Sequence, residues 1–382
     1  MLLKSAQVGS KIRAKHTRLG DIMLHFLKKP FVYAICISCL LAGLLALSLL
    51  DVFIIAKTIE IEEYETIDYS KFFSQEFSGT LPPSLQEETS PGGSTITLPS
   101  PDGEVSTDTA ESTDTSESSD SSVQEETDPP SKPKYPIVTE NSYEDEHIRI
   151  QISTIRRFDS TIYVAEVILS SPTYLKTALA HDEFGLNITE KTSSQANRVG
   201  AILAINGDYY GANERGYVIR NGVLYRDSTR SSSFEDLAIL YDGSFKTFRE
   251  RDVVLRDLLH KEGAMQVLAF GPTLLKNQQI VVDTDTEVGV ANKKNGNPRT
   301  VIGIVEPLHY FFVVADGRTA ESFGPTLHQM AQIMQELGCS TAYNLDGGGS
   351  STMYFNGRVI NNPTTHGSIS ERSVSDIVYI GY

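Results

Sequence analysis

The sequence has no tryptophan and only three cysteines among its 382 residues, and its acidic residues outnumber its basic ones. Cys36 and Cys39 lie in an apolar N-terminal stretch and Cys339 lies alone in the C-terminal part, so no disulfide can form within that part. The formal net charge of −16 argues against nucleic-acid binding, which needs a basic face, and no nucleic-acid partner is expected. Zinc-ligand spacing, a P-loop and a nucleophile elbow are also missing.

A basic tail and an apolar run open the chain. Residues 31–50 carry no charge and have the length of about 20 residues that a helix needs to cross a bilayer. Because a positive flank stays in the cytoplasm, residues 1–29 are predicted to be a cytoplasmic tail and residues 30–56 a transmembrane signal anchor. A cleaved signal peptide is the alternative. An exported, cysteine-poor chain favours a bacterial membrane, of the Gram-positive kind, with the C-terminal domain extracytoplasmic.

Residues 57–136 are predicted to be an acidic linker rich in Ser, Thr and Pro. Its first part, residues 57–77, mixes acids with Ile, Tyr and Phe and is expected to form a short membrane-proximal helix. Residues 78–136 have too few large apolar side chains to offset the entropy of ordering, so this stretch is expected to be disordered. Such a linker would hold the next domain away from the membrane.

The remaining residues, 137–382, are predicted to form one strand-rich domain. Alternating or β-branched runs predict strands at 147–152, 162–169, 174–179, 201–205, 301–305, 310–314, 342–345 and 374–380. Hairpin turns are indicated by Asn221-Gly222, Asp242-Gly243 and Asn356-Gly357. Helices are expected at 192–198, 253–261 and 326–337. The expected fold class is α+β, with a mixed, strand-rich sheet and two or three helices.

The most informative stretch is Asn344-Leu-Asp-Gly-Gly-Gly-Ser-Ser-Thr352. Three successive glycines carry an entropic cost and are expected where the backbone takes positive φ or lies close to another group. Consecutive backbone N–H groups in such a turn can form an anion site, and Asp346 would lie at its rim. A glycine-rich turn without a ligand is the alternative interpretation.

Two more acids follow predicted buried strands. Asp208 follows the strand at 201–205, and Asp316 follows the strand at 310–314. Because functional groups gather where strands end in loops, these two carboxylates and Asp346 are expected to meet at one rim. Each of them could instead cap its own turn through the side chain.

Basic side chains could complete an anion site. Arg299, Arg318 and Arg372 are candidate clamps, since a guanidinium pairs with two phosphate oxygens, although each could form a surface ion pair instead. His366 lies in a loop close to Glu371 and could be in the site or solvated. The carboxylates of residues 283–287 offer only a weak possibility of a divalent cation such as Ca²⁺, and no cofactor is expected otherwise.

Several motifs together resemble the phosphodiester glycosidase family, whose best-known member is the lysosomal uncovering enzyme. Beside the glycine run, the matching pieces are Ala204-Ile-Asn-Gly-Asp-Tyr-Tyr210, Phe270-Gly-Pro-Thr273, Asn297-Pro-Arg-Thr300, Ala315-Asp-Gly-Arg318 and Glu371-Arg-Ser-Val-Ser-Asp376. They occur in family order from about residue 200 to the C-terminus. Ser373 departs from the pattern, which has Pro there.

This resemblance implies hydrolysis of a sugar-1-phosphodiester between the anomeric carbon and the phosphate oxygen, by a phosphodiester alpha-N-acetylglucosaminidase-like glycosidase. It implies catalytic carboxylates at Asp346 and Asp208, with Asp316 in reserve. The implied substrate-binding residues are Asn206, Arg299, Arg318, Gly347, Gly348, Gly349, Ser350, Ser351, His366, Glu371 and Arg372.

The expected partner is a phosphorylated glycan or cell-wall polymer, such as a wall teichoic acid or capsule, on the outer side of the membrane. Bacterial relatives are often associated with exopolysaccharide, so the substrate itself does not carry over. Two alternatives remain open: a phosphodiesterase that cuts the P–O bond, and a non-catalytic glycan-binding or assembly module.

Overall fold

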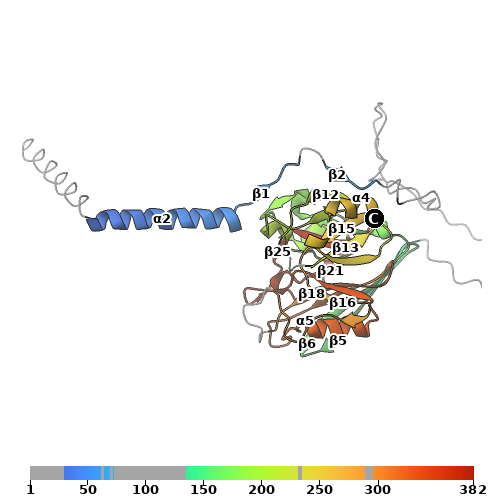
Figure 1. Ribbon diagram of the computed structural model, residues 1–382. Coiled ribbons are helices and arrows are strands. Elements are labelled where there is room, and N and C mark those ends of the chain that lie inside the picture. Colours follow the sequence, from blue (N-terminus) through green and yellow to red (C-terminus); the bar gives the residue numbers. More distant parts are fainter. Residues whose placement is uncertain (1–29, 62–63, 69–71, 73–134, 231–234, 289–295) are drawn as a thin grey trace, which may run out of the picture.

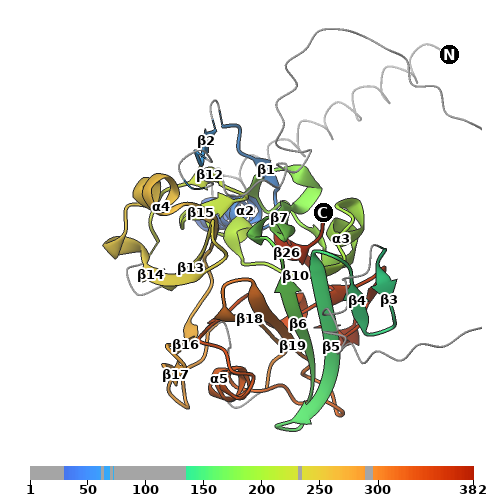
Figure 2. The same ribbon diagram turned by 90° about the vertical axis from the view of Figure 1, so that its right-hand side faces the viewer.

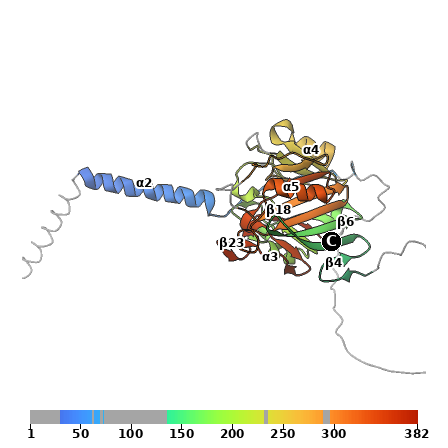
Figure 3. The ribbon, with the colours of Figure 1, turned by 90° about the horizontal axis from the view of Figure 1, so that it is seen from below.

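The computed structural model describes residues 30–61, 64–68, 72, 135–230, 235–288 and 296–382. The predicted cytoplasmic tail and most of the predicted acidic linker lie outside these residues, as do residues 231–234 and 289–295. The first helix, α2 (Pro30–Phe53), stands out from the rest of the molecule (Figures 1 and 3). In the part of the chain that is described, no helix combines the length and the apolarity needed to cross a membrane.

Three antiparallel sheets make up the domain, and the largest has nine strands. Its strands, in spatial order, are β17 (Gln279–Ile280), β16 (Thr273–Lys276), β20 (Thr341–Asn344), β18 (Arg299–Glu306), β19 (His309–Ala315), β6 (Ser160–Leu169), β5 (Ile148–Arg157), β4 (Ser142–Glu144) and β3 (Ile137–Val138). The long β5–β6 and β18–β19 hairpins form its centre.

The other two sheets are smaller. The five-stranded sheet runs β22 (Arg358–Val359), β21 (Met353–Phe355), β10 (Leu203–Asn206), β26 (Asp376–Ile380) and β7 (Leu175–Leu179). The six-stranded sheet runs β14 (Phe245–Arg249), β13 (Glu235–Leu240), β15 (Ala264–Leu268), β11 (Val218–Arg220), β12 (Val223–Arg226) and β2 (Glu65–Thr66). Three short pairs complete the set: β1 (Lys57–Thr58) with β8 (Gly185–Leu186), β9 (Glu190–Lys191) with β25 (Ser373–Val374), and β23 (Thr364–Thr365) with β24 (Ser368–Ile369).

The main hydrophobic core lies between the three sheets, because each sheet contributes one apolar face to it. Alternate residues of a strand point to opposite faces, so Phe312 enters this core while its neighbour Val313 faces a second one. One helix covers each outer face: α5 (Leu327–Glu336), α3 (Thr192–Arg198) and α4 (Leu255–Glu262) pack on the nine-, five- and six-stranded sheets, respectively (Figure 2).

The predicted α+β class and the strand-rich character are confirmed, and three α-helices lie in the domain. The predicted mixed sheet is wrong: every strand pair in the described residues is antiparallel. Antiparallel neighbours can be joined by short hairpins, whereas parallel neighbours need a long crossover. The paired runs around Asn221-Gly222 and Asn356-Gly357 already favoured the first kind of connection.

The predicted membrane-proximal helix at 57–77 is also wrong where the structure describes it. Residues 57–58 and 65–66 are strands that pair with β8 and β12 of the domain. The isoleucines of this stretch, at positions 59, 61 and 67, bury surface against the domain, which outweighs any local preference for a helix.

Candidate active site

Strands from all three sheets end around one point of the molecule. The nine-stranded sheet brings the end of β20 at Asn344, the five-stranded sheet brings the end of β10 at Asn206, and the six-stranded sheet brings the end of β15 at Leu268. Loops that follow these ends carry the polar residues, in keeping with the usual placement of binding groups on loops held by a rigid scaffold. Hydrogen bonds from Asn206 to Asp346 and from Asn344 to Gly271 join the loops that follow these strand ends.

The glycine run leaves β20 and turns through the 3₁₀ helix η7 (Gly348–Ser350). Gly348 has φ +64°, in the left-handed region that favours glycine. The amides of Gly348, Ser350 and Ser351 donate to the carbonyl oxygens of Pro298, Gly347 and Gly348, respectively. These amides are therefore engaged within the protein, and the hypothesis that they present a row of free donors to an anion does not hold for them.

The glycines instead give room to two arginines. A methyl group at Gly348 would lie 2.9 Å from Nη2 of Arg318, and one at Gly349 would lie 2.9 Å from Nε and Nη2 of Arg372. Such separations are too short for a side-chain carbon, so larger residues would displace the guanidinium groups. The guanidinium groups of Arg318 and Arg372 thus pack against the bare backbone of the glycine loop.

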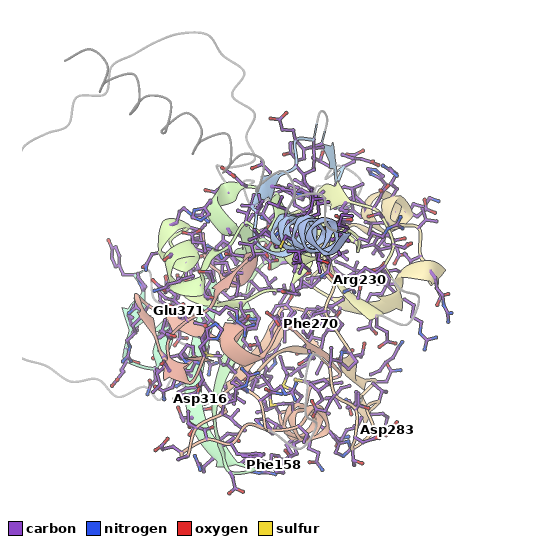
Figure 4. The ribbon with its side chains drawn as sticks, turned by 90° about the vertical axis from the view of Figure 1, so that its left-hand side faces the viewer. Phe158, Arg230, Phe270, Asp283, Asp316 and Glu371 are labelled. Atoms are coloured by element: carbon purple, nitrogen blue, oxygen red, sulfur yellow. The ribbon has the colours of Figure 1, made fainter. Side chains whose placement is uncertain are left out.

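A pocket of about 110 Å³ opens beside this loop. Its walls are Phe270, Val288, Asn297, Arg299, Arg318, Asn344, Leu345, Asp346, Gly347, Gly348 and Arg372. All three predicted arginine clamps therefore lie on one pocket, together with the predicted acid of the glycine run. Figure 4 shows Phe270 near the middle of the molecule, with Asp316 and Glu371 to one side of it and Asp283 to the other.

Asp346 is the acid that lines the pocket. Burial raises the pKa of its carboxyl group to about 6, against the opposing effects of the Ser350 hydroxyl and the Arg372 guanidinium. Asp208 repels it and adds to the rise. A carboxyl group with a pKa near 6 changes its charge close to neutral pH, which suits a group that exchanges protons during a reaction.

A buried ion cluster lies behind Asp346. The Arg220 guanidinium Nη2 lies 3.0 Å from Asp208 Oδ2 and 2.7 Å from Asp376 Oδ2, and all three side chains are almost fully buried. Tyr210 stacks on Arg220, with 5.4 Å from its ring centroid to Cζ. Burial raises the pKa of Asp376, and its neighbours Asp208 and Asp346 add to the rise while Arg220 opposes it. Two acids and one base leave this cluster with a negative charge whenever both acids are ionised.

Asp208 is fully occupied in this cluster. Its Oδ1 accepts from the amide of Tyr210 at 2.9 Å, and its Oδ2 accepts from the amide of Ala269 at 2.7 Å. It does not line the pocket, so its influence on Asp346 is electrostatic. Removing Arg220 from such a buried group would leave uncompensated charge, which costs about 3–5 kcal/mol in comparable cases.

The three arginines of the pocket differ in how much of their charge is balanced. Arg299 is buried and its guanidinium pairs with Glu287, while burial lowers its pKa. Arg318 donates from Nε and Nη2 to Asn297 Oδ1, at 2.9 and 2.6 Å. Burial, and then repulsion from Arg372, lower the pKa of Arg318. No acidic partner within 4 Å is found for Arg318 or Arg372 among the described residues.

Two amide side chains of the pocket keep a buried polar atom without a partner. These are Nδ2 of Asn297, a donor, and Oδ1 of Asn344, an acceptor. Their other amide atoms are bonded, to Arg318 and to the carbonyl of Gly271. Buried polar atoms normally have a hydrogen-bond partner. A ligand in the pocket could supply both missing partners, by accepting a hydrogen bond from Asn297 Nδ2 and donating one to Asn344 Oδ1.

Two predicted site residues serve to hold the loop. Asn206 donates to the carbonyl of Asp346 at 2.7 Å and accepts from Thr300 Oγ1 at 2.7 Å, so its side chain ties two sheets to the glycine run. Asp316 accepts from Asn361 Nδ2 at 3.1 Å and from the amide of Asn362 at 3.0 Å. Neither side chain lines the pocket, and the three acids predicted to share a rim are not brought together there.

The other predicted residues also lie outside the pocket wall. Glu371 accepts from the amide and hydroxyl of Ser193, at 2.9 and 2.6 Å, and so caps the first turn of α3. His366 is exposed in the β23–β24 turn. Ser350 and Ser351 are buried beneath the loop.

Sequence reasoning missed Asn297, Asn344 and Phe270 in the wall and Arg220 and Asp376 in the ion cluster. Four of these lie in the quoted family motifs, so their motif membership was an available signal. Arg220 had none, because it is the last residue of an ordinary strand, β11, and its partners are 12 and 156 positions away.

Metal binding has no support in the described residues, where no group of three or more His, Cys, Asp or Glu side chains is placed to hold an ion. Within the stretch considered for Ca²⁺, Asp283 and Asp285 are exposed and Glu287 pairs with Arg299. The residues present do not form a set of oxygen ligands of the kind that Ca²⁺ requires.

The model of one known protein family matches most of the domain. Residues 199–381 match the phosphodiester glycosidase family. Over 203 residues the chain is 32% identical to the SPbeta prophage-derived uncharacterized protein YomE of Bacillus subtilis (strain 168). This covers 52% of the chain and 31% of YomE, so the chain spans about a third of the curated relative that it matches.

Two solved structures are similar to the chain at low identity. The catalytic domain of zebrafish N-acetylglucosamine-1-phosphodiester alpha-N-acetylglucosaminidase, auto-inhibited by pro-peptide, has 21% identity and a TM-score of 0.48, over 62% of this chain and 83% of that one. A hypothetical protein from Synechocystis has 15% identity and a TM-score of 0.43, over 62% of each chain.

The class that the match indicates is that of the glycosidases. More particularly, residues 199–381 match the phosphodiester glycosidase family, which confirms the resemblance found in the motifs.

Proposed function

We propose that the domain hydrolyses the glycosidic bond of a sugar-1-phosphodiester. The observation that carries the proposal is the pocket itself, which is lined by three arginines and by one buried acid whose pKa is raised to about 6. Such a pocket offers positive charge to one end of a ligand and a titratable carboxyl group to the other. A sugar joined to a phosphate has this polarity.

The arginine end would hold the phosphate. Arg318 and Arg372 carry charge that no acidic side chain within 4 Å balances among the described residues, and Asn297 adds a free N–H donor. Guanidinium groups match phosphate oxygens with paired hydrogen bonds. As the bond breaks, negative charge grows on the leaving phosphate, so donors already in place there would lower the barrier.

Asp346 would then act on the sugar side, as the base that activates water or as the nucleophile. A phosphate monoester has a second pKa of about 6, so it leaves without needing a proton from an acid. The reaction needs catalysis at the anomeric carbon, where an ionised carboxylate can attack directly or activate the attacking water. Since Asp346 alone among the three predicted acids lines the pocket, Asp208 is assigned to positioning and electrostatics rather than to contact with substrate.

The setting of the reaction is a separate part of this proposal. We infer that α2 anchors the domain on the outer side of a bacterial membrane, where it acts on a cell-surface glycan or polymer. Support comes from the uncharged run at 31–50 with its basic flank, and from the exposed leucines of α2 at positions 40, 41, 44, 45 and 47. Fractionation of cells tests this location: a domain recovered wholly in the soluble cytoplasm would contradict it.

The activity is tested by offering the purified full-length chain a panel of sugar-1-phosphodiesters and phosphorylated wall polymers. A glycosidase releases free reducing sugar together with a phosphate monoester. A phosphodiesterase would release a sugar phosphate instead. Asp346→Asn serves as the matched inactive control. Release of sugar phosphate would favour the phosphodiesterase, and turnover of no substrate would favour a binding or assembly module.

A further inference from the structure

Residues 57–61 and 64–68, here called the strap, follow α2 and lie on two edges of the domain (Figure 2). β1 of the strap pairs with β8, with Thr58 opposite Gly185. β2 of the strap pairs with β12, with Glu65 opposite Leu224. The strap therefore binds the domain by strand pairing, in which the backbone supplies the hydrogen bonds: β2 extends the edge of the six-stranded sheet at β12, and β1 forms a two-stranded sheet with β8.

Further backbone contacts fix the register of the strap. The amide of Ile59 donates to the carbonyl of Phe184 at 2.9 Å, and the amide of Ile67 donates to that of Gly222 at 2.8 Å. Gly185 is shaped for this contact, since a methyl group there would lie 2.1 Å from the carbonyl oxygen of Lys57. No larger residue at position 185 could leave the strap in place.

The strap also completes two hydrophobic clusters. Ile67 is only 4% exposed and belongs to the cluster beneath α4. Ile59 and Ile61 pack against the cluster that holds Phe184 and Tyr210. Without the strap, both clusters would present apolar side chains to water, which is unfavourable.

Charged groups join the strap to α4. The Glu65 carboxylate accepts from Arg256 Nε at 2.7 Å and also contacts His260. The hydrogen bond from His260 outweighs desolvation and, with Arg256, holds the pKa of Glu65 below its usual range. The strap is thus held by backbone, apolar and charged contacts together.

We propose that the strap is an integral part of the catalytic domain and that it fixes α2 to this domain without help from the connection that follows. Only residues 54–56 separate the last residue of α2 from the first residue of the strap. Residues 73–134 lie outside the described residues, and the described part of the domain continues from residue 135. Cleavage within residues 73–134 would therefore leave the N-terminal piece bound to the domain through the strap.

The test uses the full-length chain in detergent, with an N-terminal affinity tag and a site for a specific protease inserted between residues 100 and 101. After complete cleavage, the tagged piece is captured under native conditions and the retained domain is quantified. We expect at least nine-tenths of the domain to stay bound at micromolar concentration. Loss of most of the domain from the captured piece would overturn the proposal.

A matched pair of variants at neighbouring residues of the strap sharpens the test. Ile67→Asp places a charge on the buried face of the strap, and Thr66→Asp places the same charge on its exposed face. We expect Ile67→Asp to release at least ten times more domain than Thr66→Asp after cleavage. Equal release from the two variants would contradict the docking argument. If Ile67→Asp does not fold, the retention of the unaltered and Thr66→Asp domains decides the question, and neither readout depends on catalytic activity.

Discussion

At the scale of single residues, the site depends on one carboxyl group kept in an unfavourable environment. Asp346 is buried and has a pKa of about 6, well above the ordinary value near 3.8. The buried cluster of Asp208, Arg220 and Asp376 lies behind it, and the arginines of the pocket lie in front. The balance between these charges decides in which form Asp346 meets the substrate.

The pH dependence of the reaction tests this balance. If the ionised carboxylate of Asp346 is the working form, kcat/KM should rise through pH 6 and then level off. Asp346→Asn should lower kcat/KM at least 1,000-fold, because the carbonyl oxygen of Asn can neither take a proton nor attack at neutral pH. A profile that falls above pH 6 would instead make Asp346 an acid, and near-normal turnover in the variant would remove it from the chemistry.

Stability should respond in the opposite sense to activity. The folded-state pKa of Asp346 lies above the unfolded value, so the folded protein loses stability as the pH rises from about 4 to about 6. Asp346→Asn removes this penalty and should stabilise the fold by up to about 3 kcal/mol above pH 6, with little effect near pH 4. Denaturant unfolding at both pH values checks the prediction, which fails if the variant is less stable at pH 7.5.

At the scale of elements, the glycine loop explains why three arginines can share one pocket. Gly348 and Gly349 present bare backbone to Arg318 and Arg372, and Arg299 begins strand β18 next to the end of β20. Asn206 and Asn361 then hold the loop on either side, through Asp346 and Ser351.

A small substitution in the loop should therefore weaken anion binding. Gly349→Ala would bring a methyl group 2.9 Å from Arg372, whereas Gly381→Ala would make only ordinary contacts of 3.4 Å or more. We expect Gly349→Ala to raise the dissociation constant for inorganic phosphate about tenfold, as measured by calorimetry, while Gly381→Ala leaves it unchanged. Equal affinities in the two variants would show that the arginine position does not matter.

Asp316 also has a structural role, because its carboxylate accepts hydrogen bonds from Asn361 and Asn362 and does not line the pocket. Asp316→Asn replaces one of two carboxylate oxygens, both of which accept from N–H groups of Asn361 or Asn362, by an NH₂ donor, and it should destabilise the fold by about 1–3 kcal/mol. The affinity for phosphate should persist at temperatures where the variant remains folded. A selective loss of turnover with unchanged stability would instead support the catalytic role that the family resemblance implied as a secondary possibility for Asp316.

Elements with local signals could be predicted from the sequence, and those that depend on distant contacts could not. α5 begins after Thr326 with a capping box to Gln329, and Gly338 follows it at φ +82°, as the pattern of residues indicated. The hairpins at Asn221 and Asn356 place both residues at positive φ, as their Asn-Gly turns predict. Asp346 and the arginine clamps were accessible because they sit in or near short motifs. The Asp208–Arg220–Asp376 cluster was not, because its members come from different sheets and meet only in the folded chain.

At the scale of the whole molecule, three sheets close around one core and each brings a strand end to the site. The strap adds a strand to one of these sheets and packs near Tyr210, which stacks on Arg220 behind the pocket. The strap is therefore connected to the buried ion cluster through the hydrophobic cluster that contains Tyr210.

Deleting parts of the N-terminal region should thus have unequal effects. Removal of residues 57–68 should lower the melting temperature by several degrees, because it exposes the apolar clusters that the strap covers. Removal of residues 90–120, which lie in the predicted linker, should leave the melting temperature within about a degree of the full-length value. A strap deletion that melts like the full-length chain would contradict the role given to these residues.

The position of the cut bond tests the central claim most directly. The reaction is run in H₂¹⁸O with a sugar-1-phosphodiester, and the phosphate product is examined by ³¹P NMR and mass spectrometry. Attack at the anomeric carbon, with the phosphate held by Arg318 and Arg372, leaves no ¹⁸O in the phosphate monoester. Incorporation of one ¹⁸O atom into the phosphate would show attack at phosphorus and contradict the account.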